Sequence, residues 1–149
     1  MNKSNQLLAY SNIDHQLTGD GLIIDLTNTS HGRDLLEACI LLNKAISLII
    51  NFEKLKGFGK IPLLDVFLND KKHHLGALGL YGLSQSSMPS LEHDGHGQQH
   101  LIELDNVPKE LVSDLLNVRK VNRIILSSAK PLLNKASLTI GRVTLSFSE

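Results

Sequence analysis

Short apolar segments that end at glycine, proline, asparagine or serine recur along most of this 149-residue chain. Segments of this length, rich in leucine, isoleucine and valine, are typical of β-strands separated by turns. Residues 75–84 are apolar on both sides, which predicts a central strand of a sandwich. The seven segments are residues 21–28, 45–55, 63–70, 75–84, 100–105, 121–129 and 136–147.

Two other segments, residues 32–43 and 108–117, show helical spacing of their apolar residues, and Thr29 or Ser30 could cap the first. We therefore predict a mainly β protein, a single antiparallel β-sandwich of about seven or eight strands with one or two short helices. Hydrophobic residues make up 42% of the chain, enough for one core. We assign residues 1–20 to an N-terminal extension and residues 21–149 to the β-sandwich domain.

Fifteen basic residues balance fifteen acidic ones, so the chain lacks the surplus of positive charge that nucleic-acid binding requires. We interpret a local patch of Lys54, Lys56 and Lys60 as a solvated surface. No segment reaches the roughly 18 apolar residues of a membrane span, and the N-terminus lacks the apolar run of a signal peptide. We expect a cytoplasmic protein that binds neither nucleic acid nor a membrane. The single cysteine, Cys39, excludes an internal disulfide.

Five of the seven histidines lie between residues 73 and 100, in a stretch rich in glycine. Neutral imidazoles are the commonest ligands of copper and similar metals, so these residues are candidate metal ligands. A glycine-rich loop does not by itself hold ligands in convergent geometry. We therefore predict no intrinsic cofactor, and opportunistic binding of copper or another divalent metal. The candidate ligands are His73, His74, His93, His96 and His100.

The sequence assigns no catalytic residue. A serine-hydrolase elbow of the form GxSxG is absent, and scattered Ser, His and Asp residues co-occur by chance. We therefore favour a protein without enzymatic activity of its own. The apolar stripe at Leu111, Val112, Leu115 and Leu116 either binds a partner or closes one end of the core, and we favour the core. An exposed strand edge could support a homo-oligomer.

Read in order, several segments resemble the carboxy-terminal β-sandwich domain of tyrosinases and polyphenol oxidases. The resemblance covers roughly residues 44–149, and its most specific piece is IGRVTL at residues 140–145. The other pieces are LIINFEKLKG, IPLLDVFLND, HLGALGLYGLS, the loop that contains residues 93–97, and HLIELDNVPKELVSDL.

This resemblance implies a noncatalytic role. In that family the oxidase chemistry resides in a separate helical domain whose histidines hold two coppers, so no catalytic residue carries over to this chain. The family's β-sandwich covers the entrance to the dicopper site and keeps the enzyme latent. A side chain on one of its loops can act as a plug. If the same geometry applies, Met88 or Leu91 would be the partner-binding residue.

Our leading hypothesis is a noncatalytic β-sandwich that shields or matures a separately encoded tyrosinase-like dicopper oxidase through protein–protein contact. One alternative is a small metal-binding protein or metal-dependent enzyme that uses the loop from His73 to His100. Another is a homo-oligomeric structural or ligand-binding sandwich.

Overall fold

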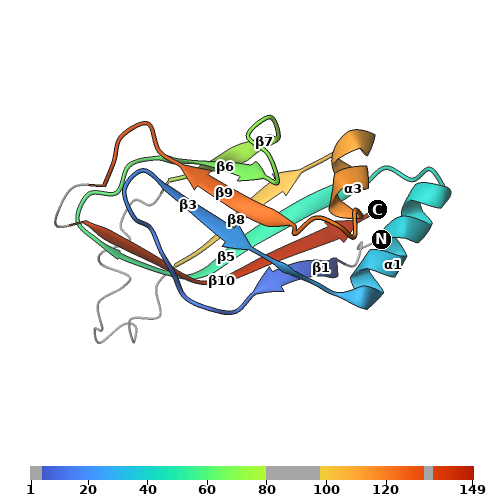
Figure 1. The fold of residues 1–149 in the computed structure, drawn as a ribbon, viewed down its shortest axis with the longest axis horizontal. Helices are drawn as coiled ribbons and strands as arrows, with labels where there is room; N and C mark the ends of the chain where they lie inside the picture. Colours follow the sequence, from blue (N-terminus) through green and yellow to red (C-terminus); the bar gives the residue numbers. More distant parts are fainter. Residues whose placement is uncertain (1–4, 80–97, 133–135) are drawn as a thin grey trace.

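The computed structural model describes residues 5–79, 98–132 and 136–149 as two antiparallel sheets packed face to face (Figure 1). The prediction of a mainly β, antiparallel sandwich is confirmed. The larger sheet has the strand order β4-β1-β10-β5-β8, with β2 also paired to β10, and the smaller sheet has the order β3-β9-β6-β7. The strands are β1 Gln6–Ser11, β2 His15–Gln16, β3 Gly21–Asp25, β4 Thr27–Asn28, β5 Ser47–Phe58, β6 Leu64–Leu68, β7 His74–Leu78, β8 Gln98–Leu104, β9 Arg123–Ser127 and β10 Ser137–Ser148.

The described residues form ten strands rather than seven or eight, for two reasons. Residues 6–16, which we had placed in an extension, form β1 and β2 of the larger sheet. A register shift between Leu7 and Ala9 turns the consecutive residues Leu8 and Ala9 inward. The apolar residues of β1 therefore lack the regular alternation that predicts a strand from the sequence.

The single strand predicted at residues 21–28 is in fact two strands. Leu26 is buried, and around it the chain crosses from β3 in the smaller sheet to β4 in the larger one. No glycine or proline lies between Asp25 and Thr27 to mark where the chain changes sheets. The segment predicted as a central strand, residues 75–84, begins with β7 at the edge of the smaller sheet, and its residues from 80 onward lie outside the described part of the chain.

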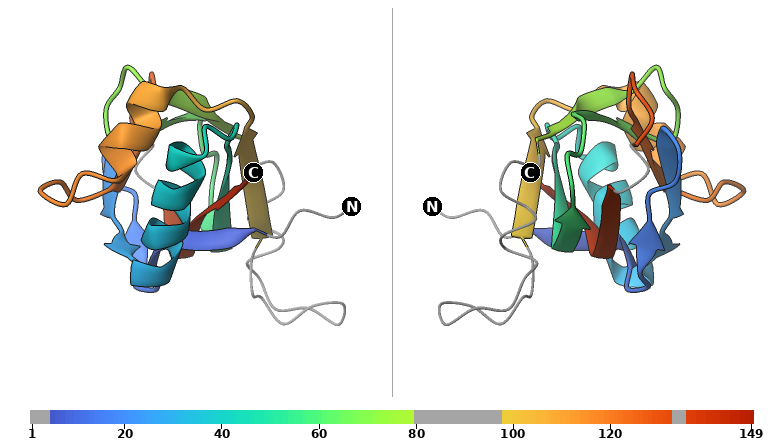
Figure 2. Two further views of the ribbon diagram at one scale, coloured as in Figure 1. Left: turned by 90° about the vertical axis from the view of Figure 1, so that its right-hand side faces the viewer. Right: turned by 90° about the vertical axis from the view of Figure 1, so that its left-hand side faces the viewer.

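Two helices, α1 Ser30–Leu41 and α3 Lys109–Leu115, lie at the same end of the sandwich (Figures 1 and 2). The predicted cap of α1 is Thr29, whose hydroxyl accepts a hydrogen bond from the Gly32 amide at 3.2 Å and donates one to the Leu7 carbonyl at 2.7 Å. A β-carbon on Gly32 would lie 2.0 Å from that same carbonyl oxygen, so only glycine lets α1 approach β1 this closely. Leu111, Val112 and Leu115 of α3 are buried in the core.

Strands β5 and β10 pair along almost their whole length, from Ser47 opposite Ser148 to Phe58 opposite Ser137. Lys54 interrupts β5 with a left-handed backbone (φ 56°), at the point where the register between β5 and β8 also shifts. The register places it opposite Gly141, where an added β-carbon would lie 2.8 Å from the Lys54 β-carbon. Next to it, Arg142 and Glu53 form an ion pair at 3.3 Å. The Gly-Arg pair inside IGRVTL thus accommodates a bulge in the neighbouring strand.

We expect Gly141→Ala to lower the free energy of unfolding by about 1–3 kcal/mol, because the new methyl group overlaps Lys54. Lys54→Gly removes both that overlap and the cost of a left-handed non-glycine residue, about 1–2 kcal/mol, so the double variant should recover most of the loss. Urea unfolding measures all three. Gly79→Ala is the matched control, because its nearest neighbour would lie at an ordinary 3.8 Å. Equal stability of Gly141→Ala and the original chain would contradict this explanation of the motif.

Candidate functional site

The predicted metal ligands are only partly described by the structure. His73 ends the turn between β6 and β7, and His74 begins β7, with its ring 3.1 Å from a carboxylate oxygen of Asp65 and edge-on to Phe67. His100 lies in β8 of the other sheet, opposite Phe52. His93 and His96, and the plug candidates Met88 and Leu91, lie outside the described residues. Within the described ranges no three metal-ligating side chains converge, and metal binding stays a prediction.

Two other side chains, Ser11 and Cys39, carry groups that act as nucleophiles in some enzymes, and the structure shows what surrounds each. The Ser11 hydroxyl lies 2.9 Å from a ring nitrogen of His15, but no carboxylate among the described residues bonds the other ring nitrogen, as a catalytic triad requires. The Cys39 thiol is partly buried and 3.8 Å from Glu149. Burial raises the pKa of Cys39, and the charge of the Glu149 carboxylate raises it further. The thiol is therefore protonated at neutral pH and is a weak nucleophile.

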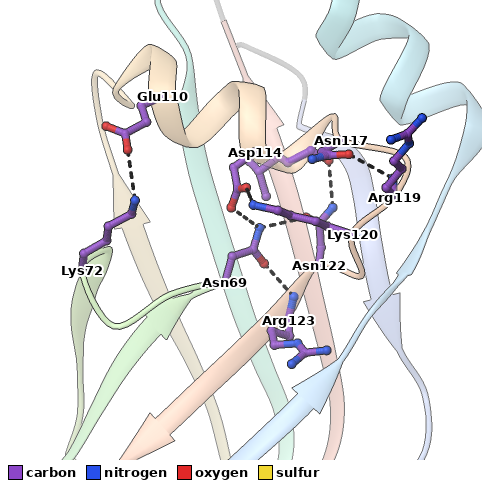
Figure 3. Close-up of polar contacts among 10 residues, drawn as sticks. Asn69, Lys72, Glu110, Asp114, Asn117, Arg119, Lys120, Asn122 and Arg123 are labelled. Carbon is purple, nitrogen blue, oxygen red and sulfur yellow. Dashed lines mark hydrogen bonds and ion pairs between the residues drawn. The ribbon is translucent and has the colours of Figure 1, made fainter.

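A polar cleft of about 700 Å³ opens between α3, the turn that follows β6, and the start of β9. Figure 3 shows several of the polar side chains in and around it. Its walls contain basic, acidic and amide side chains. The lining residues are Asn69, Asp70, Lys72, His73, Glu110, Ser113, Asp114, Asn117, Arg119, Lys120, Val121 and Arg123.

Asn69 is the centre of this cleft, and its backbone is left-handed (φ 65°), a conformation that asparagine tolerates better than most residues. Its side-chain amide donates to Asp114 at 3.1 Å and to Asn122 at 2.9 Å. Its side-chain oxygen accepts a hydrogen bond from the Arg123 amide at 2.8 Å. A single side chain thereby joins the β6–β7 turn to α3 and to β9.

Asn122 lies beneath Asn69 and is completely buried. Besides accepting from Asn69, its amide donates to the Asn28 side chain at 2.9 Å and to the Leu115 carbonyl at 3.0 Å. Both asparagines therefore use their donors and acceptors on protein groups, as buried amides must. We name the hydrogen-bonded set of Asn28, Asn69, Asp114 and Asn122 the asparagine clip.

Ion pairs surround the asparagine clip. Lys120 lies 2.7 Å from Asp114, and Lys72 lies 3.2 Å from Glu110 (Figure 3). The hydrogen bond from Lys120, followed by the one from Asn69, lowers the pKa of Asp114, so this carboxyl group stays ionised and accepts from both. Because Asn69, Asp114 and Asn122 satisfy one another, these side chains organise this end of the sandwich.

A second, less polar hollow lies at the helical end of the sandwich. This groove, of about 470 Å³, runs from the end of α1 to the start of α3, and we name it the α1–α3 groove. Three consecutive apolar residues end α1 beside it, and they are exposed: Ile40 by 38%, Leu41 by 81% and Leu42 by 67%. The lining residues are Ile40, Asn43, Lys44, Ala45, Ile46, Asn106, Val107, Lys109, Val112 and Ser113.

Sequence reasoning did not identify either site. The groove combines two segments that are at least sixty residues apart, and the clip joins side chains up to 94 residues apart. One local signal for the clip was present, because Asn69 and Asp70 end a predicted strand segment and asparagine favours left-handed turn positions. Lys54, which we had assigned to a solvated basic patch, is exposed and also forms the bulge opposite Gly141.

A protein-family model matches residues 10–147. The chain belongs to the family described as Domain of unknown function (DUF7868). No curated protein matches this DUF7868 chain. Neither described helix has the length and apolar character needed to cross a membrane.

Solved structures similar to this DUF7868 chain include latent apple tyrosinase, at 12% identity and a TM-score of 0.44, over 92% of this chain and 28% of that one. Another is recombinant latent aurone synthase (polyphenol oxidase) co-crystallized with hexatungstotellurate(VI), at 16% identity and a TM-score of 0.40, over 92% of this chain and 24% of that one. The chain thus spans about a quarter of the length of these structures. Similarity at this level of sequence identity and TM-score establishes neither the activity nor the partners of this chain.

The asparagine clip generates a stability prediction. Asn69→Gly removes three hydrogen bonds but keeps the left-handed backbone, and we expect it to lower the free energy of unfolding by about 2–4 kcal/mol, because Asn122 loses a buried partner. Asn69→Ala should cost about 1 kcal/mol more, because alanine disfavours that backbone. Urea unfolding checks both values. Asn117→Ala at the rim is the control, and equal losses at the rim and the centre would refute the role given to Asn69.

Proposed function

We propose that this chain is a noncatalytic β-sandwich that binds a separately encoded tyrosinase-like dicopper oxidase and acts as its shield or maturation partner. The observation that carries the proposal is the placement of the segments that resemble the family's β-sandwich domain. They coincide, in chain order, with elements of one sandwich: β5, β6, β7, β8 with α3, and β10. The most specific segment, IGRVTL, lies in β10, between β1 and β5 of the larger sheet.

The α1–α3 groove is the surface that we assign to the oxidase. Leu41 and Leu42 are the most exposed leucines of the described chain, and they stand together beside a groove with Ile46 and Val112 in its walls. Exposed apolar residues that cluster beside a hollow are typical of protein–protein contact sites. Burial of one leucine side chain contributes about 1.5–3 kcal/mol, so two leucines can anchor a partner.

Charged groups at the rim restrict the kind of partner that fits the groove. Lys44 and Lys109 line it, and Lys44 is paired with Glu149, whereas no described side chain pairs with the Lys109 ammonium group. An apolar segment flanked by an acidic residue would match this rim. The oxidase surface around the dicopper entrance would supply that segment. Met88 and Leu91 remain candidates for a plug that reaches the entrance itself.

The test is the activity of a tyrosinase-like dicopper oxidase domain titrated with the purified chain. We expect its phenol oxidation rate to fall as the chain binds, with copper content unchanged. Leu41→Glu places a charge at the contact and should raise the half-inhibitory concentration about tenfold or more.

The matched control is Ile23→Glu, because Ile23 is also an exposed aliphatic residue but lies in the smaller sheet, away from the groove. It should inhibit like the original chain. If the chain neither binds the oxidase nor changes its rate or its copper loading, the proposed function is wrong. If Leu41→Glu and Ile23→Glu act alike, the assignment of the groove is wrong.

A further inference from the structure

The walls of the α1–α3 groove contain two asparagines whose backbones are left-handed. Asn43 follows α1 (φ 54°), and Asn106 precedes α3 (φ 51°). The backbone amide of Val107 donates to the Ile46 carbonyl at 2.9 Å, which holds the two wall segments beside each other. Left-handed residues other than glycine are concentrated at sites that clamp ligands. The groove therefore has this uncommon backbone on both of its sides.

The backbone conformation alone does not require asparagine at these two positions, because glycine adopts it with less strain. Asparagine adds a side-chain amide. In the asparagine clip the left-handed Asn69 uses its amide on three protein groups. Within the described ranges, neither Asn43 nor Asn106 has a side-chain hydrogen bond, and both residues are exposed. Their amides are therefore available to a molecule that enters the groove.

The groove between the two asparagines has an apolar floor. Ile46, Val107 and Val112 line it, and they are exposed by 4%, 9% and 4%. An apolar side chain that enters the hollow loses its contact with water against these residues. The volume of about 470 Å³ lies at the small end of the range for ligand pockets, so the groove takes a short segment of a partner.

The charge of the groove selects the residue that accompanies the apolar side chain. The lining contains two lysines and, among the described residues, no acidic side chain. Lys109 has no ion-pair partner in the described structure, because its neighbour Glu110 pairs with Lys72 in the polar cleft. Asp105, which precedes the lining, accepts a hydrogen bond from Ser47. An acidic residue next to the apolar one therefore complements Lys109.

We propose that the α1–α3 groove binds an extended polypeptide segment, whose backbone bonds to the side-chain amides of Asn43 and Asn106. An asparagine amide offers N–H and C=O groups, which match the C=O and N–H groups of an extended chain. A helix uses those backbone groups internally, so it would leave both amides without partners. An apolar side chain of the segment packs on the floor, and an adjacent acidic side chain pairs with Lys109. This inference rests on the proposed function, in which the oxidase supplies the segment.

NMR titration of the full chain with short peptides tests the inference. The probes are capped at both ends and carry leucine, phenylalanine or methionine, followed by glutamate, in a glycine–serine host. We expect at least one of them to shift resonances around the groove, with a Kd of about 1 mM. The same peptide with a methyl group on the backbone nitrogen of the apolar residue lacks one donor. It should bind about fivefold more weakly.

Asn43→Gly and Asn106→Gly remove the amides and keep the left-handed backbone. Each should raise the Kd of the peptide about fivefold, and thermal unfolding verifies that each variant is folded. Asn12→Gly is the matched control, because Asn12 is an exposed asparagine between β1 and β2, away from the groove. Lys109→Met should weaken binding of the glutamate peptide and leave binding of its glutamine counterpart unchanged.

Two results overturn the inference. One is the absence of shifts around the groove with every probe at about 10 mM. The other is binding that backbone methylation and both asparagine variants leave unchanged, since the groove would then hold a side chain without holding a backbone. The proposed function fails separately. Peptide binding without oxidase binding refutes that function and leaves the peptide site in place, whereas oxidase inhibition that depends on Leu41 but on neither Asn43 nor Asn106 refutes this inference alone.

Discussion

The antiparallel pairing of two twelve-residue strands, β5 and β10, is the constraint on which the rest of this structure depends. Strands β1 and β2 pair with β10, and β8 pairs with β5, so the larger sheet is assembled around this pair. The bulge at Lys54 twists β5 where it passes Gly141, and the glycine allows the two strands to stay paired on both sides of it. IGRVTL thus has a structural role, in which Gly141 makes room for the bulge at Lys54.

Closure of one end of the sandwich depends on two different kinds of contact. Helix α1 is held against β1 by the close approach of Gly32 and by the Thr29 cap, whereas α3 contributes buried leucines to the core. The asparagine clip then ties α3 to the β6–β7 turn and to β9. Because the clip satisfies its own polar groups, it holds the helical end in place. The adjacent α1–α3 groove remains open to solvent, with Leu41 and Leu42 exposed beside it.

Elements with regular periodicity could be predicted from the sequence. Helical spacing predicted both helices to within a few residues, and alternation predicted β5, β6, β8, β9 and β10. The bulge at Leu8 and Ala9 concealed β1, and the lack of a glycine or proline around Leu26 concealed the crossing between sheets. The asparagine clip could not be predicted from the sequence for a different reason. Five clustered histidines are conspicuous in a sequence, but Asn69 and Asn122 acquire their importance only from partners that the fold brings together.

The central claim is that the helical end of this sandwich binds a dicopper oxidase. Hydrogen–deuterium exchange of the chain, with and without that oxidase, measures the contact directly. The claim predicts slower exchange on binding at the end of α1 and the start of α3, around Leu41, Leu42 and Val107, with β3 and β9 unchanged. Unchanged exchange at Leu41 and Leu42 in a saturated complex, or protection confined to the smaller sheet, would contradict it.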